Sequence, residues 1–157
     1  MLRFQATRGA PADQDWRGPG VRSRGYDERC LGPLSARSWR TQNDLAAANN
    51  YASDLISLER FKEAKTVLRK TLPVARRVLG ESHEHTLIIR TSYMRALYLD
   101  PDATLDDLRE AVTTLEEVER TARRVLGGAQ PTTKTAVISL ERSREALSAA
   151  EERLSKS

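Results

Sequence analysis

A six-residue stretch occurs twice in this chain, 47 residues apart. Ala-Arg-Arg-Val-Leu-Gly occupies residues 75–80 and returns at residues 122–127. The similarity extends outward at the same offset, since Glu63-Ala64 corresponds to Glu110-Ala111. Self-similarity at a fixed period of this size is typical of stacked helical repeats, in which each unit buries its apolar face against its neighbours. The repeat therefore predicts an all-α array that presents an extended surface rather than a catalytic pocket.

Charge divides the chain into two parts. Residues 1–40 hold eight arginines and four acidic residues, a net charge of +4, whereas residues 41–157 hold eighteen residues of each sign. Residues 1–40 are also rich in glycine and proline and poor in apolar residues, so we expect a disordered basic tail ahead of a helical repeat domain at 41–157. A neutral domain argues against a basic groove for nucleic acid.

Cysteine usage and hydropathy bear on the compartment. Cys30 is the only cysteine, so no disulfide forms within the chain. No stretch approaches the ~18 apolar residues that read as a membrane span, and the N-terminus lacks the apolar core of a secretory signal. These features predict a cytoplasmic protein. An arginine-rich transit peptide is the alternative, and the acidic residues among the arginines argue against it.

Apolar residues recur every three or four positions from residue 41 onward, which predicts amphipathic helices. Five helices are expected, at approximately 42–57, 60–79, 84–99, 105–126 and from 131 onward. Thr104, with Asp107 three residues later, has the signature of a capping box. Gly80 is expected to end the second helix in a left-handed conformation. Pro73 lies inside that helix, and a bend there is favoured over a break because the apolar period continues in phase.

Three stretches of the first unit form a pattern: Asn-Asn-Tyr-Ala at 49–52, Arg-Phe-Lys-Glu-Ala at 60–64, and Val-Leu-Gly-Glu-Ser-His-Glu-His-Thr at 78–86. Together they resemble the tetratricopeptide repeat of the kinesin-light-chain type. Glu59 and Glu84 stand where that family has glycine and proline. The second copy matches less completely. It is longer than the family's usual unit, with the extra residues around Asp100 to Thr104.

The resemblance implies a short solenoid of antiparallel helix pairs whose concave face binds a peptide or partner protein. In that family the first helix of each pair lines the concave face. Transferring the pattern predicts the partner-binding residues Asn49, Ser53, Ile56, Thr91, Arg95, Tyr98 and Arg142, with Ser57, Ile88, Thr135, Ile138 and Glu145 beside them. Asparagine can pair with a peptide backbone, and arginine can hold a carboxylate bidentately. An acidic extended peptide or a C-terminal carboxylate is therefore the expected ligand, and a solvated face without a ligand is the alternative.

No cluster of residues predicts catalysis. His83 and His85 are two positions apart on a predicted helix start and lack a third ligand, so we expect no metal site. Cys30 has no positioned base. Glutamates at 116, 117 and 119 interleave with arginines at 120, 123 and 124, which predicts surface ion pairs. We therefore expect a non-enzyme without cofactors.

Two other functions stay open at this stage. The first is a role as a structural subunit or fragment of a larger repeat assembly. The second is weak binding of RNA or an acidic surface by the basic tail.

Overall fold

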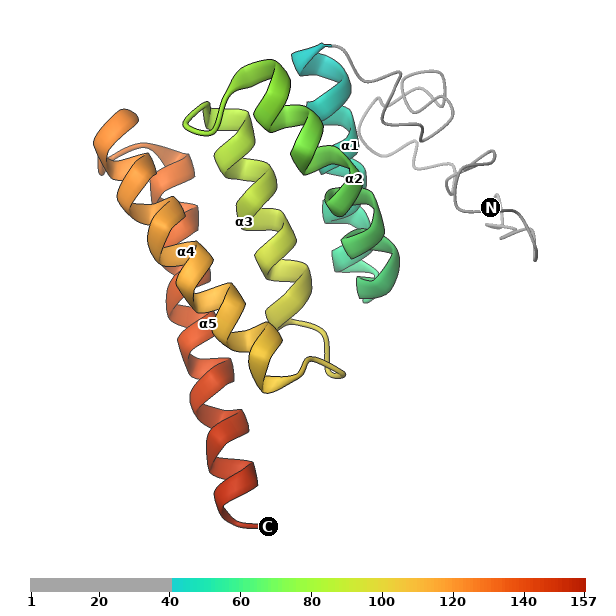
Figure 1. The fold of residues 1–157 in the computed structure, drawn as a ribbon, viewed down its shortest axis with the longest axis vertical. Helices are drawn as coiled ribbons and strands as arrows, with labels where there is room; N and C mark the ends of the chain where they lie inside the picture. Colours follow the sequence, from blue (N-terminus) through green and yellow to red (C-terminus); the bar gives the residue numbers. More distant parts are fainter. Residues whose placement is uncertain (1–40) are drawn as a thin grey trace, which may run out of the picture.

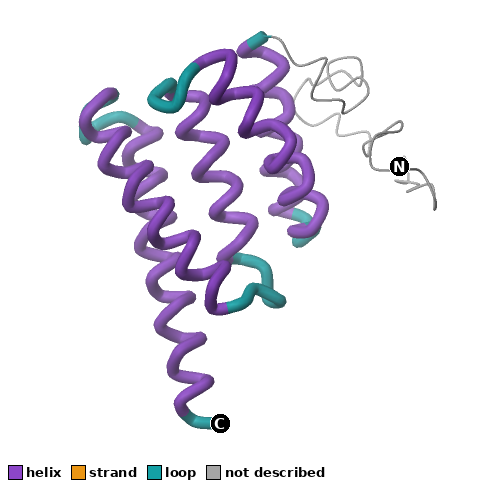
Figure 2. Tube along the Cα trace, in the orientation of Figure 1, coloured by secondary structure: helices purple, strands orange, loops and turns teal. Residues whose placement is uncertain are grey.

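The computed structural model of the chain describes residues 41–157, and the predicted tail with Cys30 lies outside the described residues. The described part folds into five α-helices and contains no strand (Figure 1). The helices are α1 (Gln42–Ser57), α2 (Phe61–Leu79), α3 (Glu84–Tyr98), α4 (Leu105–Val125) and α5 (Pro131–Ser155). Successive helices run in opposite directions and are joined by short turns (Figure 2). The predicted all-α repeat architecture is confirmed.

The third helix is the centre of the array. It contacts all four other helices, whereas α1 contacts only α2 and α3, and α5 contacts only α3 and α4. Among the described residues, α2 and α4 do not touch each other, nor do α1 and α5. The first helices of the pairs (α1, α3, α5) therefore form one layer and the second helices (α2, α4) the other.

The core follows the apolar period of the sequence. Ala64, Leu68 and Ala75 of α2 are completely buried, as are Ala111 and Leu115 of α4. One buried cluster lies among α1, α2 and α3, and a second lies among α3, α4 and α5. Each repeat thus buries its apolar face against the next, as expected for a chain that stacks rather than folds around one centre.

Capping boxes begin two of the helices. The backbone N–H of Thr104 donates to Oδ2 of Asp107 at 2.9 Å, and the Asp107 N–H donates back to the Thr104 hydroxyl oxygen at 3.1 Å. Two of the orphan donors at the start of α4 are satisfied in this way, as the sequence predicts. Thr41 and Asp44 form the same box at the start of α1.

A Schellman motif ends α1. The N–H of Arg60 donates to the carbonyl of Leu55 at 2.8 Å, and the N–H of Glu59 donates to the carbonyl of Ile56 at 3.0 Å. This pattern requires a left-handed residue after the helix, and Glu59 has φ +58°. The structure therefore shows why the family favours glycine where this chain has glutamate.

The end of α2 differs in part from the prediction. Gly80 has a positive φ of 95°, but its ψ of 160° is extended rather than left-handed helical. The extended ψ directs the chain out into the turn before α3 instead of folding it back on the last helical turn. A glycine is still required, because side chains strongly disfavour this conformation.

Pro73 lies within an unbroken α2, so the break, the alternative to the favoured bend, does not occur. Its ring lies on the exposed side of the helix. On that side, the carbonyl that loses its N–H partner can turn to water, which limits the cost of the missing bond.

Candidate partner-binding cleft

A cleft of about 240 Å³ runs across the layer of first helices. We call it the A-helix cleft, and its lining residues are Asn49 and Ser53 of α1, Ile88, Thr91, Ser92 and Arg95 of α3, and Pro131, Thr132 and Thr135 of α5. Because α1 and α5 both contact α3 but not each other, α3 forms the floor and the other two helices form the walls. The cleft therefore joins all three repeats on one face.

Arg95 is the only charged residue in the lining of the cleft. Its guanidinium is partly exposed and forms no ion pair or hydrogen bond within the described part of the chain. Two arginines on other faces of the array are engaged, by contrast: Arg60 donates to Glu63 at 2.7 Å, and Arg144 to Glu116 at 2.7 Å. The cleft thus carries one uncompensated positive charge in an otherwise uncharged lining.

Hydroxyl and amide groups supply the rest of the polar lining. The hydroxyl of Thr91 is committed to its own helix, since it donates to the carbonyl of Leu87 at 2.9 Å. Asn49 is only 7% exposed, and its Oδ1 is buried without a hydrogen-bond partner among the described residues. Unpaired buried acceptors are uncommon and cost free energy, so Asn49 is the residue of the lining whose polar capacity is not used.

The structure brings four of the seven predicted binding residues together in the cleft: Asn49, Ser53, Thr91 and Arg95. It does not place the other three there. Ile56 and Tyr98 are 5% and 6% exposed and belong to the apolar core. Arg142 is exposed on α5, beyond the part of that helix that lines the cleft. Ile56 and Tyr98 lie three residues beyond Ser53 and Arg95, near the ends of their helices, where they are buried in the core clusters.

Sequence reasoning missed three lining residues, Ser92, Pro131 and Thr132. Ser92 lies four residues after Ile88 and so on the same helical face. Thr132 donates its hydroxyl to Glu84 at 2.7 Å, which ties the first turn of α5 to the first turn of α3. The proline and the two threonines at the start of α5 were the sequence feature that could have indicated that this turn lines the cleft.

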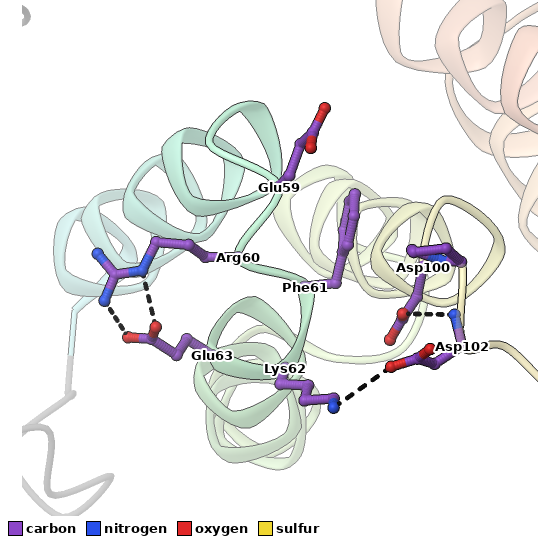
Figure 3. A pocket seen from close by; sticks show the side chains of 8 residues that line it. Glu59, Arg60, Phe61, Lys62, Glu63, Asp100 and Asp102 are labelled. Atoms are coloured by element: carbon purple, nitrogen blue, oxygen red, sulfur yellow. Dashed lines mark hydrogen bonds and ion pairs between the residues drawn. The ribbon is translucent and has the colours of Figure 1, made fainter.

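A second hollow, of about 370 Å³, lies where the turn after α1 meets the turn after α3 (Figure 3). Phe61 lies between the two turns, and the extra residues of the second repeat unit, Asp100 to Asp102, form one wall. Except for Glu59, its charged groups have partners. Lys62 lies 3.4 Å from Asp102, and Arg60 donates to Glu63. The cations of the hollow are therefore already neutralised by its own acids, in contrast to Arg95 of the A-helix cleft.

The two histidines act as local structural groups. His83 is the N-cap of α3, and its Nδ1 accepts the backbone N–H of His85 at 3.2 Å. The Nδ1 of His85 lies 3.3 Å from Nε2 of Gln42 on α1. Residues 41–157 contain no group of three potential ligands suited to a metal ion.

The predicted surface ion pairs of α4 are only partly local. Arg123 donates to Glu119 one turn away at 2.6 Å, as expected. Glu116 and Glu117 instead bridge to neighbouring helices, to Arg144 of α5 at 2.7 Å and to Arg90 of α3 at 3.0 Å. The prediction of pairs within the helix was wrong for these two glutamates, because arginines of the adjacent helices, Arg144 and Arg90, lie within reach of them.

Comparison with known protein families gives a match for the first helix pair. The family model of the tetratricopeptide repeat matches residues 45–85, from α1 to the start of α3. The match supports a repeat of the tetratricopeptide type over this part of the chain. Repeats of this type generally mediate protein–protein interaction and are typically non-catalytic. No curated protein and no solved structure matches the chain. None of the helices formed by the described residues is long and apolar enough to cross a membrane.

Proposed function

We propose that the protein is a non-catalytic interaction module whose A-helix cleft binds an extended acidic peptide or a C-terminal carboxylate. The observation that carries the proposal is the position of Arg95, the only charged residue of the cleft, with no partner in the described part of the chain. A guanidinium in such a site binds a carboxylate through two parallel hydrogen bonds. A ligand carboxylate would neutralise the positive charge of Arg95 in the cleft.

Asn49 supports the same proposal. Its amide lies on the α1 wall, and its Oδ1 has no hydrogen-bond partner among the described residues. A small rotation of the amide would present donor and acceptor together to a peptide backbone in the cleft. Asn49 would then hold the main chain, and Arg95 would select acidic side chains or a chain terminus.

The finer family assignment belongs to this proposal as well. The Asn-Asn-Tyr-Ala stretch at 49–52 and the Val-Leu-Gly-Glu-Ser-His stretch at 78–83 support a repeat of the kinesin-light-chain type. In such repeats the first helices present the binding face, which agrees with the helices that line the cleft.

The test is selection of peptides from a random display library on the full-length chain, followed by affinity measurements on the variants. Arg95→Glu is expected to weaken the selected peptides at least about tenfold, the cost of a lost charge-assisted hydrogen bond, and Asn49→Ala about three- to tenfold, the cost of lost neutral hydrogen bonds. Arg124→Glu, an exposed arginine of α4 outside the cleft, is the charge-matched control. Arg142→Glu reports whether the binding surface continues along α5. Peptides that lack acidic residues, or that bind the Arg95→Glu variant unchanged, would refute the proposal.

A second candidate is a structural role within a larger repeat assembly. Val78 and Val125, at equivalent positions of the two repeats, are 42% and 50% exposed. Concentration-dependent association, measured by analytical ultracentrifugation, would favour this candidate.

A further inference from the structure

The two second helices of the array have opposite charge. α2 contains six basic residues and one acidic residue, whereas α4 contains four basic and six acidic residues. The difference arises at equivalent positions of the 47-residue repeat. Arg69 and Lys70 of α2 correspond to Glu116 and Glu117 of α4. The basic character of α2 is therefore not a property of the repeat pattern.

Four of the six cations of α2 lie on its outer side. Lys62, Arg69, Arg76 and Arg77 are all exposed, and we call them the α2 basic stripe. Lys62, Arg69 and Arg76 follow one another at steps of seven residues, with Arg77 next to Arg76, so the charges rise about 10 Å at a time along a straight helix. Thr66 and Pro73 lie between them and are also exposed. No acidic residue of α2 interrupts the stripe between Arg69 and Arg77.

The charge of the stripe is poorly compensated. Arg69 and Arg77 have no ion pair or hydrogen bond among residues 41–157. Arg76 lies 3.0 Å from Glu81, and Lys62 lies 3.4 Å from Asp102, but all four of these side chains are at least two-fifths exposed. Exposed pairs of this kind contribute little and exchange readily with other partners. By contrast, Glu116 and Glu117 at the equivalent positions of α4 are bound to neighbouring helices.

The outer side of α2 is also free of neighbouring helices. α2 contacts α1 and α3 only, and it runs along the outside of the array (Figure 1). The A-helix cleft is lined by α1, α3 and α5, so the stripe is a separate surface.

We infer that the α2 basic stripe is a second docking surface, specific for an acidic α-helix of a partner protein. A helix lying alongside α2 would present glutamates at the same seven-residue interval as Arg69 and Arg76, which makes the charges complementary along the contact. The stripe is only one helix wide, and the next outer helix, α4, is net acidic. A broad polyanion such as a nucleic-acid duplex or an anionic membrane would meet those acids, whereas a single helix would not.

The experiment uses the full chain and a defined probe, an alanine-rich peptide of about 21 residues with one stripe of glutamates. Such a helix is about 10 Å wide, too bulky for the A-helix cleft. Affinity is measured by fluorescence anisotropy at physiological salt, because weak surface electrostatics are exaggerated at low salt. The Arg69→Glu/Arg77→Glu variant is expected to bind at least tenfold more weakly than the wild type.

The matched control is Arg120→Glu/Arg124→Glu, which makes the same charge change on α4 at exposed arginines that likewise have no partner among the described residues. It should change affinity less than threefold, and so should Arg95→Glu in the cleft. Unchanged melting temperatures establish that the variants fold. Absence of wild-type binding, or equal losses in the α2 and α4 variants, would overturn the inference. Tighter α2-dependent binding of a DNA duplex or of phosphatidylserine vesicles would overturn the choice of an acidic helix.

Discussion

The ammonium nitrogen of Lys65 lies 2.7 Å from Oδ2 of Asp100, and this ion pair joins α2 to the turn after α3. The Asp100 side chain is 5% exposed and that of Lys65 20% exposed. Oδ1 of Asp100 also accepts the backbone N–H of Asp102 at 3.0 Å. One carboxylate thus links the first repeat to the second and shapes the turn in which the second unit is lengthened.

Removal of Lys65 should be costly. Lys65→Met leaves the Asp100 carboxylate buried without its main partner, and we expect the free energy of unfolding to fall by about 2–3 kcal/mol. Urea denaturation measures the change. Lys62→Met breaks only the exposed pair with Asp102 and should cost less than about 0.5 kcal/mol. Equal losses in the two variants would show that the buried pair has no special weight.

The free energy of unfolding should decrease in acid, because the carboxylates of Asp100 and Asp107 become protonated. Burial raises the pKa of Asp100, but the hydrogen bonds from Lys65 and Asp102 and the lysine charges outweigh it, so the pKa is lowered overall. Hydrogen bonds from the Thr104 backbone and hydroxyl lower the pKa of Asp107. Because both are lowered on folding, their contribution is present above the ordinary carboxyl pKa of 3.8 and is lost as the pH falls through the folded values.

Urea denaturation across the acidic range tests this pH dependence. Asp100→Asn and Asp107→Asn should each flatten the loss of stability with falling pH, because the ionised form can no longer be favoured in the folded state. Asp106→Asn, an exposed acid in the same turn as Asp107, is the control and should leave the slope largely unchanged. A slope that no single variant alters would contradict the assignment.

Loss of the α4 capping box should be measurable on its own. Thr104→Ala removes the hydroxyl that accepts the Asp107 N–H at 3.1 Å, and we expect a loss of about 1 kcal/mol in the free energy of unfolding. Thr113→Ala, at an exposed position inside α4, should not destabilise the protein and is the control. Thermal or urea denaturation distinguishes the two.

Glycine at position 59 should stabilise the chain. Glu59 holds a φ of +58° in the Schellman motif, a conformation that costs a side-chain-bearing residue roughly 1–2 kcal/mol. Glycine removes that cost, but it also makes the unfolded chain more flexible, which favours unfolding. The net effect of Glu59→Gly should be a rise in the free energy of unfolding of about 0.5–1 kcal/mol. Glu59→Ala keeps the strain and should give no comparable gain. Stabilisation by alanine alone would assign the effect to charge instead.

Local signals in the sequence were enough to place the helices. The predicted and observed bounds of α1 agree, Gln42 to Ser57, and those of α2 and α3 differ by one residue at one end. These ends depend on caps, proline and the apolar period, all of which act within a few residues. The family pattern likewise identified the layer that carries the cleft.

The cleft and the charge pattern depended on how the helices are rotated against one another. Asn49 and Ile56 lie on the same helix, yet one lines the cleft and the other is buried in the apolar core. The partners of Glu116 and Glu117 come from α5 and α3, and the absence of a partner for Arg95 is visible only when every nearby helix is in place. The sequence by itself determined the helices, their caps and the repeat, because those follow from short-range physics. The tertiary structure alone decided which polar groups meet, because packing sets that geometry between residues far apart in the chain.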